Sequence, residues 1–150
     1  MKPLDILATA IAYVVAADGQ TTVEEKAQLI SMLGKHVSSG DISQGDLQKM
    51  TQSAFSNAEK IPLEKFLTVV GGSLSQGQKA VLLLNLYDVA AVDGSIALGE
   101  KKVIEAFEKA LHIDENSITK ARDIIAYKND TAVFTNPAHP KNEKTHNFFV

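Results

Sequence analysis

An internal repeat constrains the fold of this chain more than any other feature of its sequence. Residues 16–26 (AADGQTTVEEK) align with residues 91–101 (AVDGSIALGEK) at an offset of 75 residues, and five of the eleven aligned positions are identical. In each copy an apolar stretch precedes the Asp-Gly pair, and an amphipathic stretch follows it. The repeat therefore predicts two similar helical hairpins, related by a pseudo-twofold axis, within one chain of 150 residues.

The spacing of apolar residues is helical throughout the chain. They recur every three or four residues, and the sequence has no long alternating run of the kind that indicates a β-strand. Thr22 and Ser75 are each followed three residues later by Glu or Gln, a pattern typical of helix N-termini, and Gly71-Gly72 is expected to end a helix. These signals predict an all-α bundle of about seven helices, at residues 3–17, 22–37, 43–59, 62–71, 76–92, 98–111 and 114–128.

The chain divides into a helical body and a tail. From residue 129 onward the helical spacing disappears, and Pro137 and Pro140 interrupt a run of small polar residues. We expect one helical domain over residues 1–128 and an extended or poorly ordered tail over residues 129–150. The apolar end of the tail, Phe148-Phe149-Val150, is suited to docking on the body or on a neighbouring chain.

Composition excludes several classes of site and partner. The chain has no Cys, which rules out disulfides, Cys-ligated zinc, iron–sulfur clusters and thiol nucleophiles. Its basic residues are dispersed and its net charge is −3, so no nucleic-acid partner is expected. The apolar stretch 6–17 is shorter than the roughly 20 residues of a membrane-spanning helix, and Asn85 and Asp88 interrupt the stretch 80–92. We therefore expect a cytoplasmic protein without direct membrane insertion.

The doubled Ala-x-Asp-Gly-x₅-Glu-Lys pattern, one copy in each half of an all-helical chain, resembles the TerB-like tellurite resistance family. Related domains occur next to J-domains in certain co-chaperones. The resemblance covers about residues 4–112, and it implies a pseudo-twofold bundle of about seven helices. It also implies acidic residues that bind a divalent cation, Ca²⁺ or Mg²⁺, at the two Asp-Gly turns. Carried onto this sequence, these residues are Asp18 and Glu25 in the first copy and Asp93 and Glu100 in the second.

Two further acids are secondary candidates for the same site. Glu24 adjoins Glu25, and Asp88 precedes Asp93 by five residues. Tyr13 occupies the position equivalent to Asp88 in the first copy, so a site that includes Asp88 would be asymmetric. The turn acids also have a purely structural explanation, because Asp-Gly forms tight turns and a Glu in a first helical turn stabilises the helix N-terminus.

The distribution of charge favours the cation interpretation. Residues 3–25 contain four acids and residues 80–100 contain three, and neither segment contains a Lys or an Arg. The two acid-only segments include the two repeat turns. The mild net charge of the whole chain thus hides two acidic regions that the predicted pseudo-twofold axis would relate.

Three functions are compatible with these features. The resemblance favours a non-enzymatic module for the response to stress or to tellurite-type toxic anions, with an acidic surface that engages other proteins, membrane-associated resistance components among them. A metal-dependent enzyme with a carboxylate-only site is one alternative, although no catalytic residue is assigned because no nucleophile elbow or phosphate loop occurs. A plain homodimeric scaffold, anchored by Phe148-Phe149, is the other alternative.

Overall fold

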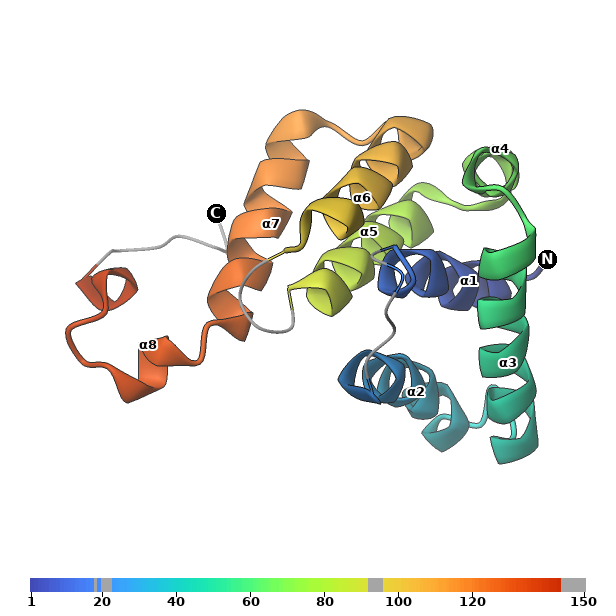
Figure 1. Ribbon diagram of the computed structural model, residues 1–150, viewed down its shortest axis with the longest axis horizontal. Coiled ribbons are helices and arrows are strands. Elements are labelled where there is room, and N and C mark those ends of the chain that lie inside the picture. The colour runs from blue at the N-terminus through green and yellow to red at the C-terminus, as the bar shows by residue number, and fades with distance from the viewer. Residues whose placement is uncertain (18, 20–22, 92–95, 144–150) are drawn as a thin grey trace.

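The computed structural model describes residues 1–17, 19, 23–91 and 96–143 (Figure 1). Within these ranges it contains eight α-helices, one 3₁₀ helix and no strand, which confirms the all-α prediction. The elements are α1 (Pro3–Val15), α2 (Val23–Ser38), α3 (Gln44–Lys60), α4 (Leu63–Ser73), α5 (Gln76–Ala90), α6 (Leu98–Leu111), α7 (Glu115–Asn129), α8 (Ala132–Thr135) and a 3₁₀ helix (Pro140–Glu143). No helix among the described residues is long and apolar enough to cross a membrane.

The first helix is the centre of the core. Every residue of α1 from Ile6 to Val15 is buried except Leu7, so the helix is covered on nearly all sides. Phe66 of α4 packs between Tyr13 of α1 and Phe107 of α6, with ring centroids 5.1 and 6.1 Å away. An apolar helix of this kind is stable in water only when other helices surround it.

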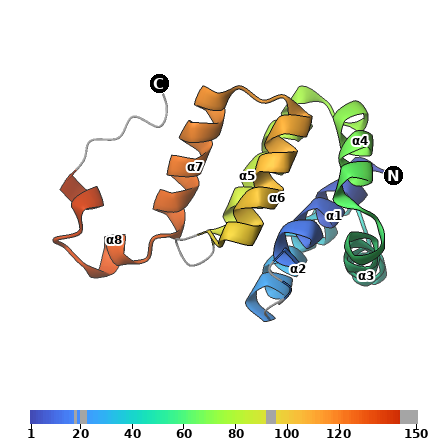
Figure 2. The same ribbon diagram turned by 45° about the horizontal axis from the view of Figure 1, so that its top comes forward.

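The packing of the helices follows the predicted pseudo-twofold relation. The two apolar helices α1 and α5 contact each other, α2 packs on α1, and α6 packs on α5. The crossed pairs α1–α6 and α2–α5 are also in contact, and α3 lies against α1 as α7 lies against α5. Figures 1 and 2 both show α5, α6 and α7 side by side. The sequence repeat is therefore a repeat of three-dimensional structure.

Polar side chains cap the helices where the sequence indicates. The Ser75 hydroxyl accepts a hydrogen bond from the Gln78 backbone N–H (3.2 Å), and the Gln78 side chain accepts one from the Ser75 N–H (2.9 Å). Ser43 caps α3 in the same reciprocal way, and Asp114 caps α7. Thr22, the predicted cap of α2, lies outside the described residues. Each cap of this type contributes about 1 kcal/mol to helix stability.

The fourth helix differs from the prediction at its C-terminal end. Gly71-Gly72 does not end α4, which continues to Ser73. Glycine lowers helix propensity by about 1 kcal/mol relative to alanine but does not by itself break a helix. A Cβ atom on Gly71 would stand 3.5 Å from the backbone oxygen of Ala110. This distance is an ordinary van der Waals contact, so the packing of α4 on α6 does not itself require glycine at position 71.

The tail also differs from the prediction, because its described part is not extended. Residue 129 still belongs to α7, and α8 and the 3₁₀ helix follow. The side chain of Asp130 accepts a hydrogen bond from the Ala132 N–H (3.1 Å), and that of Asn136 accepts one from the Ala138 N–H (3.2 Å). These are local turns that Asp and Asn form with their own backbone, and they fold the tail without apolar periodicity. Residues 144–150, which include Phe148 and Phe149, lie outside the described residues.

The aromatic contacts of the core predict a large cost for truncating Phe107, which is fully buried. We expect Phe107→Ala to lower the free energy of unfolding by about 3–5 kcal/mol, because the substitution loses apolar burial and leaves a cavity. Val69→Ala, at a 44% exposed position of α4, should change it by less than about 0.5 kcal/mol. Urea unfolding followed by circular dichroism measures both, and equal losses in the two variants would contradict this assignment of the core.

Candidate functional site

The two matched glutamates occupy equivalent positions in the fold. Glu25 is the third residue of α2 and Glu100 is the third residue of α6. Glu25 is half-buried, Glu100 is only 7% exposed, and Glu24 is exposed. Carboxylates in a first helical turn are stabilised by the unpaired backbone N–H groups and by the helix dipole. The structure thus places each glutamate at the positive end of a helix that follows an Asp-Gly pair in the sequence.

The other two primary candidates, Asp18 and Asp93, lie outside the described residues. Within the described part of the chain, no three His, Asp or Glu side chains gather as a metal ion would require. A site with three such ligands would therefore need at least one residue outside the described part of the chain, where Asp18, Asp93 and His146 lie.

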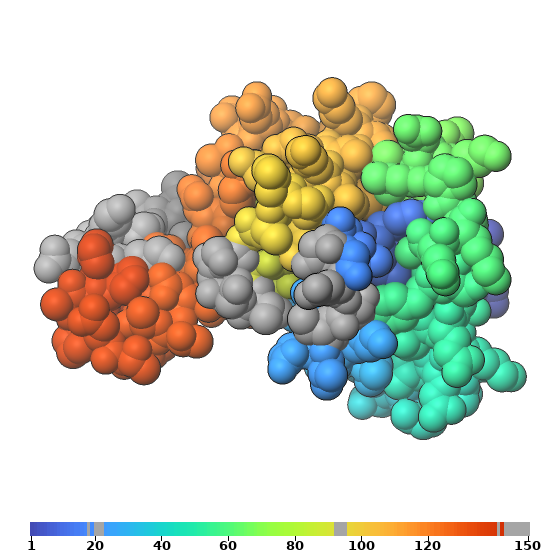
Figure 3. Space-filling view, in the orientation of Figure 1, coloured from blue at the N-terminus to red at the C-terminus, as the bar shows by residue number. Residues whose placement is uncertain are grey.

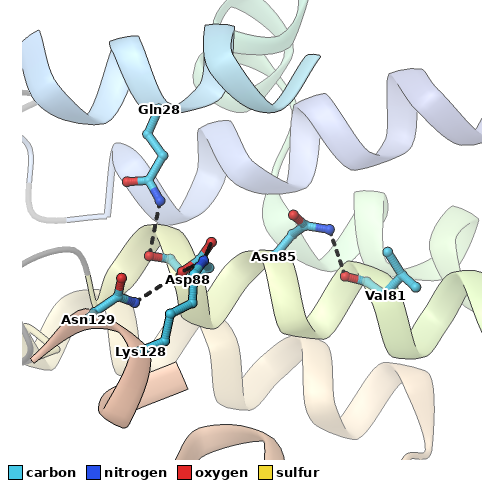
Figure 4. Close-up of polar contacts among 6 residues, drawn as sticks. All are labelled: Gln28, Val81, Asn85, Asp88, Lys128 and Asn129. Atoms are coloured by element: carbon cyan, nitrogen blue, oxygen red, sulfur yellow. Dashed lines mark hydrogen bonds and ion pairs between the residues drawn. The ribbon is translucent and has the colours of Figure 1, made fainter. Parts of the chain in front are cut away.

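Asp88, a secondary candidate, joins two helices (Figure 4). Its carboxylate accepts hydrogen bonds from the Lys128 ammonium (2.8 and 3.0 Å) and from the Asn129 side-chain amide (3.0 Å). The Asp88 side chain is 18% exposed, and the ion pair with Lys128 ties the end of α7 to α5. A metal ion at Asp88 would have to displace this ammonium group, so the described contacts favour a tethering role.

Gln28 is a polar residue of α2 that the sequence does not single out. Its side-chain N–H donates to the backbone oxygen of Asp88 (3.2 Å), as Figure 4 shows. This bond fixes the orientation of the amide, because only the NH₂ group can donate to a carbonyl. The amide oxygen is buried and has no hydrogen-bond partner among the described residues. Gln28 lies one turn after Glu25, and Asp88 lies five residues before Asp93.

The sequence does not identify this contact, because its acceptor is the backbone oxygen of Asp88, which any residue at position 88 would supply. At the repeat offset of 75 residues, Gln28 corresponds to Val103 and Asp88 corresponds to Tyr13. Val103 has no side-chain donor, so the bond that Gln28 makes has no equivalent in the other half. Tyr13 instead donates its hydroxyl to the backbone oxygen of Ile61, and burial raises the pKa of this hydroxyl.

A second polar cluster joins α5, α6 and α7. The Tyr87 hydroxyl donates to the Glu108 carboxylate, and the Arg122 guanidinium lies 3.9 Å from the same carboxylate and 5.7 Å from the centre of the Tyr87 ring. Burial raises the pKa of Glu108 above its ordinary value of 4.5, although Arg122 opposes this shift. The cluster holds α7 against the hairpin of α5 and α6.

The family model of tellurite resistance protein TerB matches residues 5–123. The chain belongs to the TerB family. The match covers both Asp-Gly turns, both glutamates and the first part of α7, which confirms the resemblance that the doubled motif indicated. No curated protein and no solved structure matches the chain. Residues 130–143, beyond α7, lie outside the part shared with the TerB family.

The raised pKa of Glu108 makes the stability of this TerB-family chain depend on pH. The folded state holds the Glu108 proton more tightly than the unfolded state, so this contribution is lost as pH rises from near 4.5 through the folded-state pKa. Glu108→Gln removes the titration and keeps an acceptor for Tyr87. We expect its free energy of unfolding to fall less over this pH range than that of the wild type, measured by urea unfolding.

A matched control separates this effect from a general loss of charge. Glu105 is exposed on the same helix, and Glu105→Gln should keep the pH dependence of the wild type. If Glu108→Gln also keeps the wild-type dependence, Glu108 does not contribute to it.

Proposed function

We propose that this chain is a non-enzymatic TerB-family module of the response to tellurite or similar toxic anions. In this proposal the acidic surface at its two Asp-Gly turns binds a divalent cation and engages protein partners. One observation carries it: in a TerB-family chain, the matched Glu25 and Glu100 stand at the third position of α2 and α6, directly after the two turns.

The chemistry of the residues near the turns suits a hard cation. Ca²⁺ and Mg²⁺ bind oxygen ligands, mainly carboxylates together with amide and backbone carbonyls. Glu100 is 7% exposed and so has little conformational freedom, which lowers the entropic cost of binding an ion. Asp18 and Asp93 supply further carboxylates at the turns in this proposal.

The amide oxygen of Gln28 also favours an ion bound between the two Asp-Gly turns. A buried polar atom without a partner costs about 1–3 kcal/mol. The Gln28 oxygen is such an atom among the described residues, and its helix carries Glu25 one turn earlier. An ion bound between the turns would supply the missing partner and recover this cost. Gln28 is therefore the neutral oxygen ligand in this proposal, beside the carboxylates.

The position of the larger described cavity favours a binding module over an enzyme. This cavity, of about 930 Å³, lies among α1, α3 and α5, and neither Glu25, Glu100 nor Gln28 lines it. A metal-dependent enzyme needs an open coordination position beside a substrate pocket. The acids near the turns are not beside this cavity, which supports a role in binding partners.

Calorimetric titration with Ca²⁺ and with Mg²⁺ tests the cation site. We expect saturable binding to the wild type, and loss of that binding in the double variant Asp18→Asn with Asp93→Asn. Gln28→Met keeps a side chain of similar length but lacks the oxygen, so it should weaken binding by at least about tenfold, as losses of coordinating partners commonly do. Circular dichroism shows whether each variant is folded.

The control variant removes two charges elsewhere on the surface. Glu64 on α4 and Asp123 on α7 are exposed, and Glu64→Gln with Asp123→Asn should bind as the wild type does. The proposal is wrong if neither cation binds the wild type, or if the double turn variant binds with undiminished affinity.

A further inference from the structure

The seventh helix is attached to the hairpin of α5 and α6 by two pairs of opposite charges. At its C-terminal end, the Lys128 ammonium lies 3.0 and 2.8 Å from the two carboxylate oxygens of Asp88 on α5, and the Asn129 amide donates to the same carboxylate. Six residues earlier on α7, the Arg122 guanidinium lies 3.9 Å from the Glu108 carboxylate of α6. The Lys128 and Arg122 side chains are 60% and 45% exposed, so water and dissolved ions reach both pairs.

The first half of the chain has neutral groups at the equivalent positions. At the repeat offset of 75 residues, Tyr13 occupies the position of Asp88, and its hydroxyl donates to the backbone oxygen of Ile61, directly after α3. Leu33, which is fully buried, occupies the position of Glu108. The fold therefore attaches α3 and α7, which are related by the pseudo-twofold axis, through different chemistry.

The apolar packing of α7 is limited to one side of the helix. Ile118 and Ile125 are its buried residues, and α5 is the helix on which it packs most extensively within the described part of the chain. In contrast, α3 packs on both α1 and α2. Figures 1 and 2 show α7 at the edge of the bundle, followed by an arm formed by residues 130–143. Segments with few buried apolar contacts open at a lower free energy than the core of a protein does.

We propose that α7 and the arm form a releasable unit, which the two ion pairs hold against the bundle and which opens when dissolved ions weaken those pairs. In the open state, Ile118, Ile125 and the part of α5 beneath α7 are exposed to solvent. The bond from Gln28 to the Asp88 backbone oxygen joins α2 to α5 and does not involve α7 (Figure 4). The first half of the chain therefore keeps its contact with α5 when α7 leaves.

Salt acts selectively on this attachment. The Debye length falls from about 30 Å at 0.01 M salt to about 3 Å at 1 M, so exposed ion pairs lose much of their attraction over this range. The hydrogen bond of Tyr13 and the apolar contacts of α1 and α3 carry no net charge that salt could screen. Rising ionic strength should therefore open α7 before it affects α3.

Native-state hydrogen exchange of the full chain, followed residue by residue in ¹H–¹⁵N NMR spectra, tests the proposal. The buffer contains NaCl and no divalent cation, so the result does not depend on the proposed cation site. Between about 0.01 M and about 1 M NaCl, we expect the backbone amides of α7 to gain at least about threefold in exchange rate relative to those of α3, because each exposed ion pair shifts an equilibrium by a few-fold.

A pair of lysine variants separates the ion pair from a general effect of charge on α7. Lys128→Met keeps a side chain of similar length but has no charge, so the end of α7 should exchange rapidly already at low salt and respond little to added salt. Lys120 is exposed on the same helix, and Lys120→Met should keep the wild-type response. Circular dichroism shows whether each variant is folded.

Three results overturn the proposal. The first is a wild type in which salt changes the exchange of α7 and α3 equally, which indicates opening of the whole domain. The second is a wild type in which salt changes neither helix. The third is a Lys120→Met variant that loses the salt response as completely as Lys128→Met does.

Discussion

The burial of two apolar helices, α1 and α5, is the constraint on which the rest of this structure depends. α1 is buried from Ile6 to Val15 except at Leu7, and α5 is buried mainly in its second half, from Leu82 to Ala90, so neighbouring helices must enclose these parts. α2 and α3 enclose α1, α6 and α7 enclose α5, and the two central helices also cover each other. The polar residues of α5 fit this enclosure, because Asn85 donates to the Val81 backbone oxygen of its own helix and Asp88 pairs with Lys128 (Figure 4). The pseudo-twofold frame follows from this packing.

The two halves of the fold have similar helix packing, but their polar side-chain contacts differ. The contact between Gln28 and Asp88 has no equivalent in the other half, where Val103 and Tyr13 occupy the corresponding positions. Backbone geometry can therefore repeat while side-chain chemistry does not. In the proposed function, the amide oxygen of Gln28, which has no partner among the described residues, supplies the cation with a ligand that Val103 cannot supply in the other half.

The fold was predictable from the sequence because its signals are local. Apolar spacing and caps such as Ser75 and Asp114 depend on neighbouring residues only, and the observed helices begin at or next to the predicted positions. The end of α4 differs from the prediction, because a pair of glycines lowers helix propensity without breaking a helix and α4 continues through it to Ser73. The folded tail was not predictable, because Asp130 and Asn136 each stabilise a single local turn, and such turns leave no periodic pattern in the sequence.

The candidate site was predictable only in part. The repeat identifies Glu25 and Glu100, since both follow an Asp-Gly pair at the same distance. Gln28 could be identified only through its contact with Asp88, which lies 60 positions away, and one sequence does not reveal such a contact. The partners of Asp88 on α7 are hidden from the sequence for the same reason.

The side-chain amide of Gln28 gives the most direct test of the proposed cation site. Two-dimensional ¹H–¹⁵N NMR spectra during a Ca²⁺ titration report on this group and on the backbone amides of Glu25 and Glu100 together. The account predicts that the three sets of signals shift in parallel and saturate at the same added Ca²⁺. It is contradicted if the Gln28 side-chain signals remain unchanged while Ca²⁺ saturates the protein, or if no signal near the turns responds.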